Sequence, residues 1–338
     1  MKRGNAADVF LLGAGFARAI SREMPLLQDL AESVLRQRRS QRGVPAPVAA
    51  MMRENFAHAL SYLEQPKPWV SEADNLRDRA LYLEFTEAIA RDLEATVARV
   101  TRRLGAGVPR WLARLIRHWH AHRCVVLTLN YDTLIETVAT AIPVGDQPID
   151  APQIYPPLLT DAGFRASGPR PEQTGDSFRL LKLHGSTNWY FSGRGDARGE
   201  PIYFVPPLPL RRVSAAERRE HEFRLNAVTD KYPLMVPPVY DKSALLTHET
   251  IRALWFEAGE ALKNAQRVVC MGYSLPESDL TMRHFLQSTI TDAAVVIADP
   301  GEEAARNFRR QFQGKRSQIK PFAHGARTIA RFVEAELE

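Results

Sequence analysis

The stretch VFLLGAGF, Val9 to Phe16, joins four apolar residues to a glycine turn. A short apolar run that ends at glycine is typical of a buried strand followed by a helix. In open α/β sheets, glycine at such a turn lets the backbone approach a pyrophosphate closely. The third glycine of the full dinucleotide fingerprint is replaced by Arg18. By itself, the stretch predicts either a nucleotide site or an ordinary strand-to-helix turn.

Four further segments place polar or glycine residues directly after apolar runs. CVVLTL precedes Asn130 and Asp132, RLLKL precedes His184, RVVC precedes residues 271–279, and AAVVIA precedes Asp299. The carboxyl ends of parallel strands meet at one edge of a sheet, where α/β proteins bind their ligands. Together, the five strand ends predict a Rossmann-like parallel sheet with helices on both faces and a nucleotide site at that edge.

In this order, the segments resemble the sirtuin superfamily, and more closely its bacterial, defence-type NAD-cleaving branch than its protein deacylases. In that family, GAG opens the dinucleotide loop, the asparagine of a TxNxD segment lies beside the nicotinamide ribose, and the histidine before glycine is the catalytic base. The resemblance implies NAD as the substrate. It implies Asn130 and His184 as catalytic residues, and as cofactor-binding residues Gly13, Ala14, Gly15, Phe16, Asp132, Gly272, Tyr273, Ser274 and Asp299.

The cysteine count separates the branches of this family. Deacylase sirtuins hold a structural zinc with two CxxC pairs, whereas this chain has only Cys124 and Cys270, each inside an apolar run. Four thiolates cannot come from two cysteines, so we expect no zinc module. The run after GAGF also departs from the deacylase pattern. Both departures favour NAD hydrolysis over peptide deacylation.

Each site residue also has a structural interpretation. Asp132 stands where a helix cap would satisfy unpaired backbone amides, which leaves Asn130 to face the ligand. His184 is one of nine histidines, and a lone histidine is usually structural. Its position at a strand end, and an ordinary histidine pKa of about 6.5, suit it to accept a proton near neutral pH.

Length and composition predict one elaborated domain. The 338 residues are 45% hydrophobic and 25% charged, which is enough to bury a large core. Helical periodicity dominates residues 26–121, which we expect to form a helical insertion or lid. Residues 143–240 are rich in proline and glycine, and predict a small irregular lobe whose extended segments are not central strands.

The sequence also bears on the compartment and on partners. The apolar run at the start is too short for a signal peptide, and no run approaches the ~18 residues of a membrane span. Unpaired cysteines in strands suit a reducing compartment, so we expect a cytoplasmic protein without a membrane partner. The net charge of +6 comes mainly from scattered arginine pairs, which favour solvated surface and leave only indirect contact with nucleic acid.

The resemblance implies an NAD+ hydrolase, or NADase, that yields nicotinamide and ADP-ribose. Stand-alone members of the branch act as anti-phage effectors, and several form rings or act with translocase-type ATPase or Argonaute partners. A regulated homo-oligomer is therefore implied as well. Two alternatives stay open: an ADP-ribosyltransferase or deacylase that cleaves the same bond, and a noncatalytic sensor of NAD or ADP-ribose.

Overall fold

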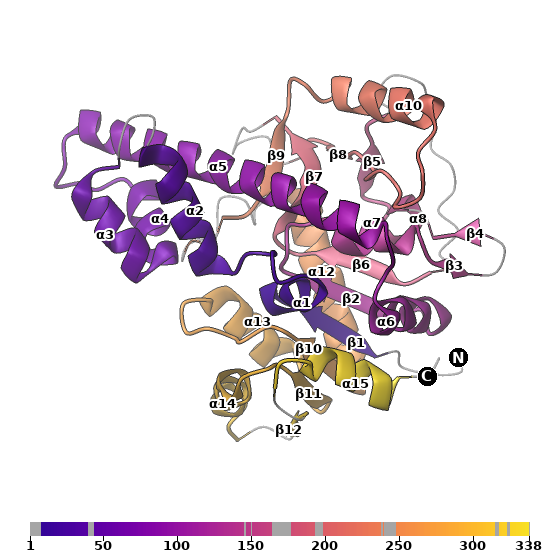
Figure 1. Ribbon diagram of the computed structural model, residues 1–338. Coiled ribbons are helices and arrows are strands. Elements are labelled where there is room, and N and C mark those ends of the chain that lie inside the picture. Colours follow the sequence, from indigo (N-terminus) through magenta and orange to yellow (C-terminus); the bar gives the residue numbers. More distant parts are fainter. Residues whose placement is uncertain are drawn as a thin grey trace.

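Six parallel strands form the central sheet of the protein, seen here in a computed structural model (Figure 1). The structure describes residues 8–39, 44–144, 147–149, 151–163, 177–192, 199–237, 239, 248–314, 318–322 and 325–337. Across the sheet, the strands are β12 (Ile319–Pro321), β11 (Ala294–Ala298), β10 (Arg267–Met271), β1 (Val9–Leu12), β2 (Val125–Thr128) and β6 (Arg179–Lys182). Every neighbouring pair is parallel, which confirms the predicted Rossmann-like class.

The chain reverses direction across the sheet between β1 and β10. From β1 it proceeds outward through β2 to β6, then returns to the other side of β1 with β10, β11 and β12. Leu12, the last residue of β1, pairs with Thr128 of β2 and with Met271 of β10. The turns after these three strands therefore emerge side by side. Ligands bind at such a switch point in doubly wound sheets.

Helices cover both faces of the sheet, which explains why its central strands are continuously apolar rather than alternating. Three helices pack together on one face: α1 (Ala14–Ile20), α6 (Arg110–Ala121) and α15 (Thr328–Glu336). The other face carries α12 (Glu249–Asn264) and α13 (Leu280–Thr289), and α14 (Glu302–Gln311) lies beside β12 (Figure 1). The main core joins the strands to the inner faces of these helices.

A helical lobe projects from one side of the sheet (Figure 1). It contains α2 (Leu27–Arg39), α3 (Ala46–Glu54), α4 (Phe56–Glu64) and the long α5 (Glu72–Leu104). These helices share a separate apolar core, with Phe56 and Phe85 at its centre. The end of α5, from Val97 onward, and all of α6 instead pack into the main core. The predicted insertion at 26–121 thus contains helices of both kinds.

The small lobe is more regular than its proline-rich sequence predicts. Its mixed sheet has the order β5 (Leu159–Asp161), β8 (Ile202–Phe204), β7 (Gly185–Phe191) and β9 (Tyr232–Met235). The lobe also contains β3 (Pro143–Val144), β4 (Gln147–Pro148), α8 (Ala151–Ile154) and α10 (Ala215–Asn226), and α7 (Leu134–Ala139) precedes it in the chain. Pro233 lies in the edge strand β9, where a missing amide is tolerated. β8 instead lies between β5 and β7, so the expectation that the extended segments of this lobe are not central strands is wrong for β8, because the prolines around it lie outside the strand itself. Of the predicted lobe, residues 145–146, 150, 164–176, 193–198, 238 and 240 lie outside the described residues.

Candidate functional site

Three glycines interlock where β1 and β10 end. The amide of Gly13 donates to the carbonyl of Met271 (3.1 Å), and that of Gly15 donates to the carbonyl of Gly272 (2.9 Å). Gly272 has a φ of +62°, and a Cβ there would lie 2.2 Å from the amide nitrogen of Phe16. Glycine is required because only a bare backbone fits this approach. The backbone of the GAG turn therefore lies at the switch point of the sheet, in direct contact with the turn after β10.

Asn130 joins the β2 turn to the β1 turn. Its Nδ2 donates to the carbonyl oxygen of Gly13 (3.0 Å), and its backbone amide donates to Thr128 Oγ1 (3.1 Å). The side-chain oxygen Oδ1 has no hydrogen-bond partner among the residues that the structure describes. Asn130 is therefore held by its nitrogen, and its oxygen stays available to a ligand.

Asp132 shapes the start of α7. Its Oδ1 accepts a hydrogen bond from the amide of Leu134 (3.1 Å). Burial raises the pKa of this carboxyl above its usual value, while the nearby Lys182 ammonium opposes that shift. The N-cap residue of α7 is Thr133 and not Asp132, so the bond holds the turn one residue before the cap that the sequence suggested. Asp132 also lines the cavity described below.

His184 lies in the turn between β6 and β7, and only 6% of it is exposed. Its ring is flanked by the rings of Tyr131 (centroids 6.5 Å apart, 30° between planes) and Trp255 (6.3 Å, 36°). Both neighbours are fixed in turn, because the Tyr131 hydroxyl donates to the carbonyl of Val236 and Trp255 Nε1 donates to that of Leu183 (3.0 Å). The imidazole is therefore held in place by aromatic packing.

The segments after β10 and β11 complete the edge. The hydroxyl of Tyr273 donates to Asp279 Oδ2 (2.9 Å), and burial together with the Asp279 carboxylate raises the Tyr273 pKa. Asn307 Nδ2 donates to the carbonyl of Ser274 (3.0 Å). The amide of Gly301 donates to Asp299 Oδ1 (3.0 Å), which orients this carboxylate at the end of β11.

The turns that follow β1, β2, β6, β10 and β11 border one cavity of about 820 Å³. Its volume falls within the usual range for cofactor sites. Every predicted site residue lines it except Phe16, whose side chain packs edge-on against Trp111 in the main core (6.0 Å, 88°). The helical lobe supplies an apolar wall opposite the strand ends, formed by Leu26, Leu27, Leu30, Ala57, Ile89 and Leu93. The cavity is therefore lined by polar and glycine residues from the strand ends and by apolar side chains from the helical lobe.

Several lining residues have no counterpart among the predicted ones. Arg18 lines the cavity but forms an ion pair with Asp29 of α2, and the exposed Arg22 also lines the cavity. Tyr131 also lines the cavity, and it lies in the sequence between the predicted residues Asn130 and Asp132. An aromatic residue in that position could have been predicted to belong to the site. Trp255 does not line the cavity, but it packs against His184 from a position 71 residues later in the chain, and no local pattern indicates that contact.

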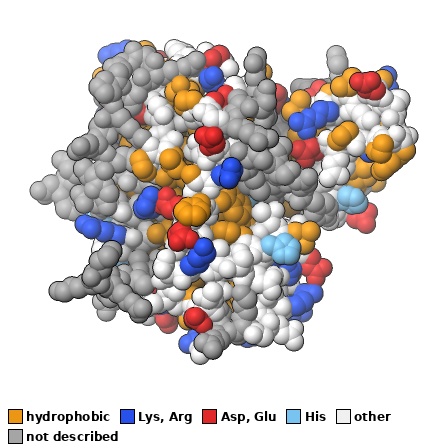
Figure 2. Space-filling model, turned by 180° about the vertical axis from the view of Figure 1, so that it is seen from behind, with side chains coloured by type: hydrophobic (Ala, Val, Ile, Leu, Met, Phe, Trp, Pro, Cys, Tyr) orange, Lys and Arg blue, Asp and Glu red, His pale blue; other side chains and the backbone are white. Residues whose placement is uncertain are grey.

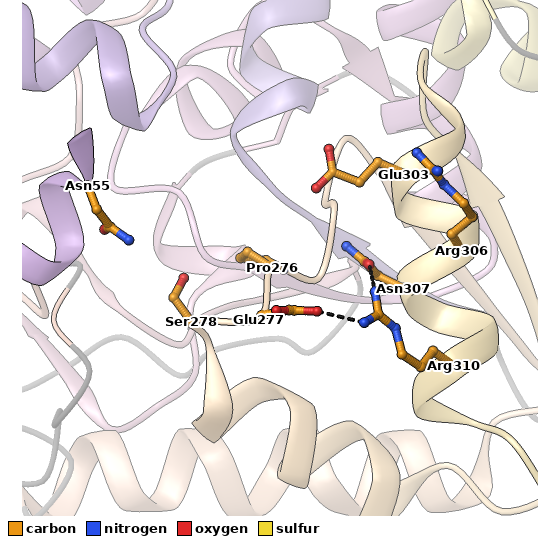
Figure 3. A pocket seen from close by; sticks show the side chains of 8 residues that line it. All are labelled: Asn55, Pro276, Glu277, Ser278, Glu303, Arg306, Asn307 and Arg310. Atoms are coloured by element: carbon orange, nitrogen blue, oxygen red, sulfur yellow. Dashed lines mark hydrogen bonds and ion pairs between the residues drawn. The ribbon is translucent and has the colours of Figure 1, made fainter. Parts of the chain in front are cut away.

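A second cavity of about 770 Å³ adjoins the first, and Pro276 and Ser278 border both. Figure 3 shows Asn55 reaching it from the helical lobe and four side chains reaching it from α14. Arg310 bonds Glu277 (2.7 Å) and, on its own helix, Oδ1 of Asn307 (3.0 Å). Because its charges are mixed and partly paired with one another, this cavity defines no ligand class.

Within the described residues, no cluster of three or more His, Cys, Asp or Glu side chains could hold a metal ion. None of the helices in that part of the chain combines the length and apolar character that a membrane span needs.

The comparisons with known proteins give matches to solved structures alone. Neither a family model nor a curated protein matches the sequence. Sir2 with a deacetylated p53 peptide and 3′-O-acetyl ADP-ribose is 14% identical and covers 98% of this chain and 94% of its own, with a TM-score of 0.39. Sir2 with a p53 peptide and NAD+ is 15% identical and covers 98% and 92%, also with a TM-score of 0.39. Because these scores lie below 0.5, the fold class rests on the strand order itself.

Proposed function

We propose that this protein cleaves the bond between nicotinamide and ribose in NAD+, giving nicotinamide and ADP-ribose. One observation carries the proposal. Asn130 and His184 follow the adjacent strands β2 and β6 and line the same cavity as the interlocked glycine turn. The amide of Asn130 can hydrogen-bond a substrate and the imidazole of His184 can accept a proton, and both lie beside a glycine turn that suits a phosphate. This combination suits hydrolysis of a dinucleotide better than binding alone.

The chemistry follows from the bond that breaks. Nicotinamide leaves a cationic N-glycoside as a neutral molecule, so no acid is needed to protonate it. The oxygen of one water then bonds to C1′ of the ribose, and a proton must leave that water. In our proposal, Oδ1 of Asn130 orients the ribose and the water, and the imidazole of His184 takes the proton from the water or from a ribose hydroxyl. The apolar wall of the helical lobe limits access of other water.

The remaining predicted residues would bind the rest of the cofactor. We assign the backbone of Gly13, Ala14 and Gly15, with Gly272 and Ser274, to the phosphates. Tyr273 braces the second turn through Asp279, and the oriented carboxylate of Asp299 suits the hydroxyls of the adenosine ribose. The positions of these residues around the cavity support this assignment.

The direct test is to incubate the purified protein with NAD+ and quantify its products by mass spectrometry. Free nicotinamide and ADP-ribose in equal amounts are expected. ADP-ribose attached to protein, or turnover that requires an acylated peptide, would support the transferase or deacylase alternative instead. NAD+ that binds but stays intact under all conditions would indicate a sensor and overturn the proposal.

We expect the purified protein to contain no stoichiometric zinc and to stay fully active with a chelator. Cys124 and Cys270 are both buried. Cys124 directly precedes β2 and Cys270 lies in β10, and β1 lies between these two strands. Burial raises the pKa of the Cys124 thiol to about 12 and also raises that of Cys270, which disfavours the thiolates that zinc requires. Elemental analysis checks this. One tightly bound zinc per chain would contradict it and revive the deacylase alternative.

We further propose that the enzyme is a regulated effector of anti-phage defence whose activity depends on assembly. The chemical reason is that an unregulated NADase depletes the NAD of its own cell. The helical lobe supports a contact between copies, because Trp69, Leu76 and Leu83 expose 79%, 64% and 50% of their surface. Leu76 and Leu83 are two turns apart on α5, and hydrophobic side chains appear on this lobe in Figure 2. Activation by a translocase-type ATPase or Argonaute partner belongs to the same proposal.

Substituting Leu76→Glu and Leu83→Glu together should shift the protein toward the monomer and lower turnover by at least tenfold. Charge placed on an apolar contact carries a desolvation cost on association. Light scattering and product assays check both effects. The control is Phe223→Glu, which alters an exposed apolar residue on α10 and should change neither. A wild-type protein that is strictly monomeric and hydrolyses NAD rapidly would defeat this part of the proposal.

A further inference from the structure

A buried ion pair lies next to the segment 130–132, which carries Asn130. Lys182, the last residue of β6, places its Nζ 2.9 Å from Oε1 of Glu136 on α7, and each side chain is 1% exposed. Removing two charges from water is costly, and well-packed apolar side chains often replace such pairs without loss of stability. Stability alone therefore does not explain why these residues occupy the core.

Lys182 also holds the main chain of the site. Its Nζ donates to the carbonyl oxygen of Asp132 at 2.6 Å. A charged donor makes a stronger and shorter hydrogen bond than a neutral one. Because Lys182 is two residues before His184, this single side chain connects the strand end that delivers His184 to the segment that delivers Asn130.

Further hydrogen bonds hold the carbonyl of Tyr131, the residue before Asp132, and the side chain of Glu136. The carbonyl oxygen of Tyr131 accepts from the amide of Thr187 (3.0 Å) and lies 3.1 Å from the hydroxyl of Ser186. Glu136 Oε1 accepts from the hydroxyl of Tyr155 (2.6 Å), which in turn accepts from Asn188 Nδ2 (3.2 Å). The carbonyls of Tyr131 and Asp132 are thus bound from the core side, whereas Asn130 bonds Gly13 at the cavity.

We propose that the buried Lys182–Glu136 pair is a positioning device that sets the segment 130–132, and so the Asn130 amide, relative to His184. The catalytic part of this inference rests on the proposed NAD cleavage. Lys182 and Glu136 do not line the cavity, so they act through the main chain of that segment. A displacement of about 1 Å in a catalytic group can cost on the order of a hundredfold in rate.

The test separates positioning from stability with a double variant. Lys182→Met alone leaves the Glu136 carboxylate buried without its counter-charge and should lower the melting temperature sharply. Lys182→Met with Glu136→Gln removes both charges and keeps an acceptor for the Tyr155 hydroxyl, so most of the stability should return. The bond to the Asp132 carbonyl does not return. We therefore expect the double variant to fold but to keep a kcat lower by roughly 10- to 100-fold, with KM changed much less.

A matched control removes a different ion pair. Arg267 and Asp8 are bonded at the opposite, amino end of the sheet, where Nε lies 3.0 Å from Oδ2. Arg267→Met with Asp8→Asn should leave kcat unchanged. In addition, Asn130→Ala should cost far less in the Lys182→Met/Glu136→Gln background than in the wild type, because Asn130 is already displaced there. Equal costs in the two backgrounds would mean that the pair does not act through Asn130.

Hydrogen exchange gives a readout that does not depend on turnover. Exchange of the amides in residues 129–134 should be at least tenfold faster in the double variant than in the wild type, and that of the other sheet strands should be unchanged. If the wild type fails to cleave NAD+, the proposed function fails, and this measurement still decides the positioning role. Unchanged exchange, or a stable double variant with wild-type kcat, would overturn the inference.

Discussion

His184→Ala is expected to abolish NAD cleavage while leaving the fold intact. The imidazole is held between the Tyr131 and Trp255 rings at the end of β6 and borders the same cavity as Asn130. A general base contributes about 10²- to 10⁴-fold, and a methyl group cannot replace it. Because the residue lies in a turn, the main sheet does not depend on its side chain. Product assays and thermal unfolding measure the two effects separately.

The control for His184→Ala is another buried histidine outside the cavity. His248 is also 6% exposed, and its Nδ1 caps α12 by accepting from the amide of Thr250 (3.3 Å). His248→Ala should cost about 1 kcal/mol of stability and leave turnover unchanged. Full turnover by His184→Ala would remove His184 from the mechanism, and collapse of its fold would make it a structural residue.

Asn130→Ala should lower kcat by roughly two to three orders of magnitude, as expected for one preorganised contact to a developing charge. NAD binding should weaken less, by about tenfold, because the hydrogen bond from Nδ2 to the Gly13 carbonyl is also lost and the glycine turn relaxes. Steady-state kinetics together with calorimetric binding separate the two terms.

Two comparison variants sharpen this result. Asn130→Asp keeps the shape but removes the donor to Gly13, and should therefore bind NAD more weakly than the wild type. Asn264→Ala removes a different amide, one that donates to the carbonyl of Glu260 (2.8 Å) at the exposed end of α12, and should have no effect on turnover. If Asn130→Ala reduced binding and kcat/KM by the same factor, Asn130 would serve ground-state binding alone.

The fold class could be predicted from the sequence because its signals are local. The strands β1, β2, β6, β10 and β11 are short apolar runs, each followed by glycine or polar residues. In a parallel sheet these ends meet at one edge, so their convergence on a single cavity was predictable as well. The small lobe was harder, since β8 and β9 pair with β7 across 13 to 50 residues and the prolines in and around them hide the strand pattern.

By itself, the sequence determined the central sheet and the candidate residues at its carboxyl edge, since apolar runs and turn residues encode strands and their ends. The tertiary structure decided how those residues are held. It turned Phe16 into the core, set Trp255 against His184, and bonded Lys182 to Asp132 and Glu136. These contacts join residues far apart in the chain, and burial of a charge depends on what folds around it rather than on its neighbours in sequence.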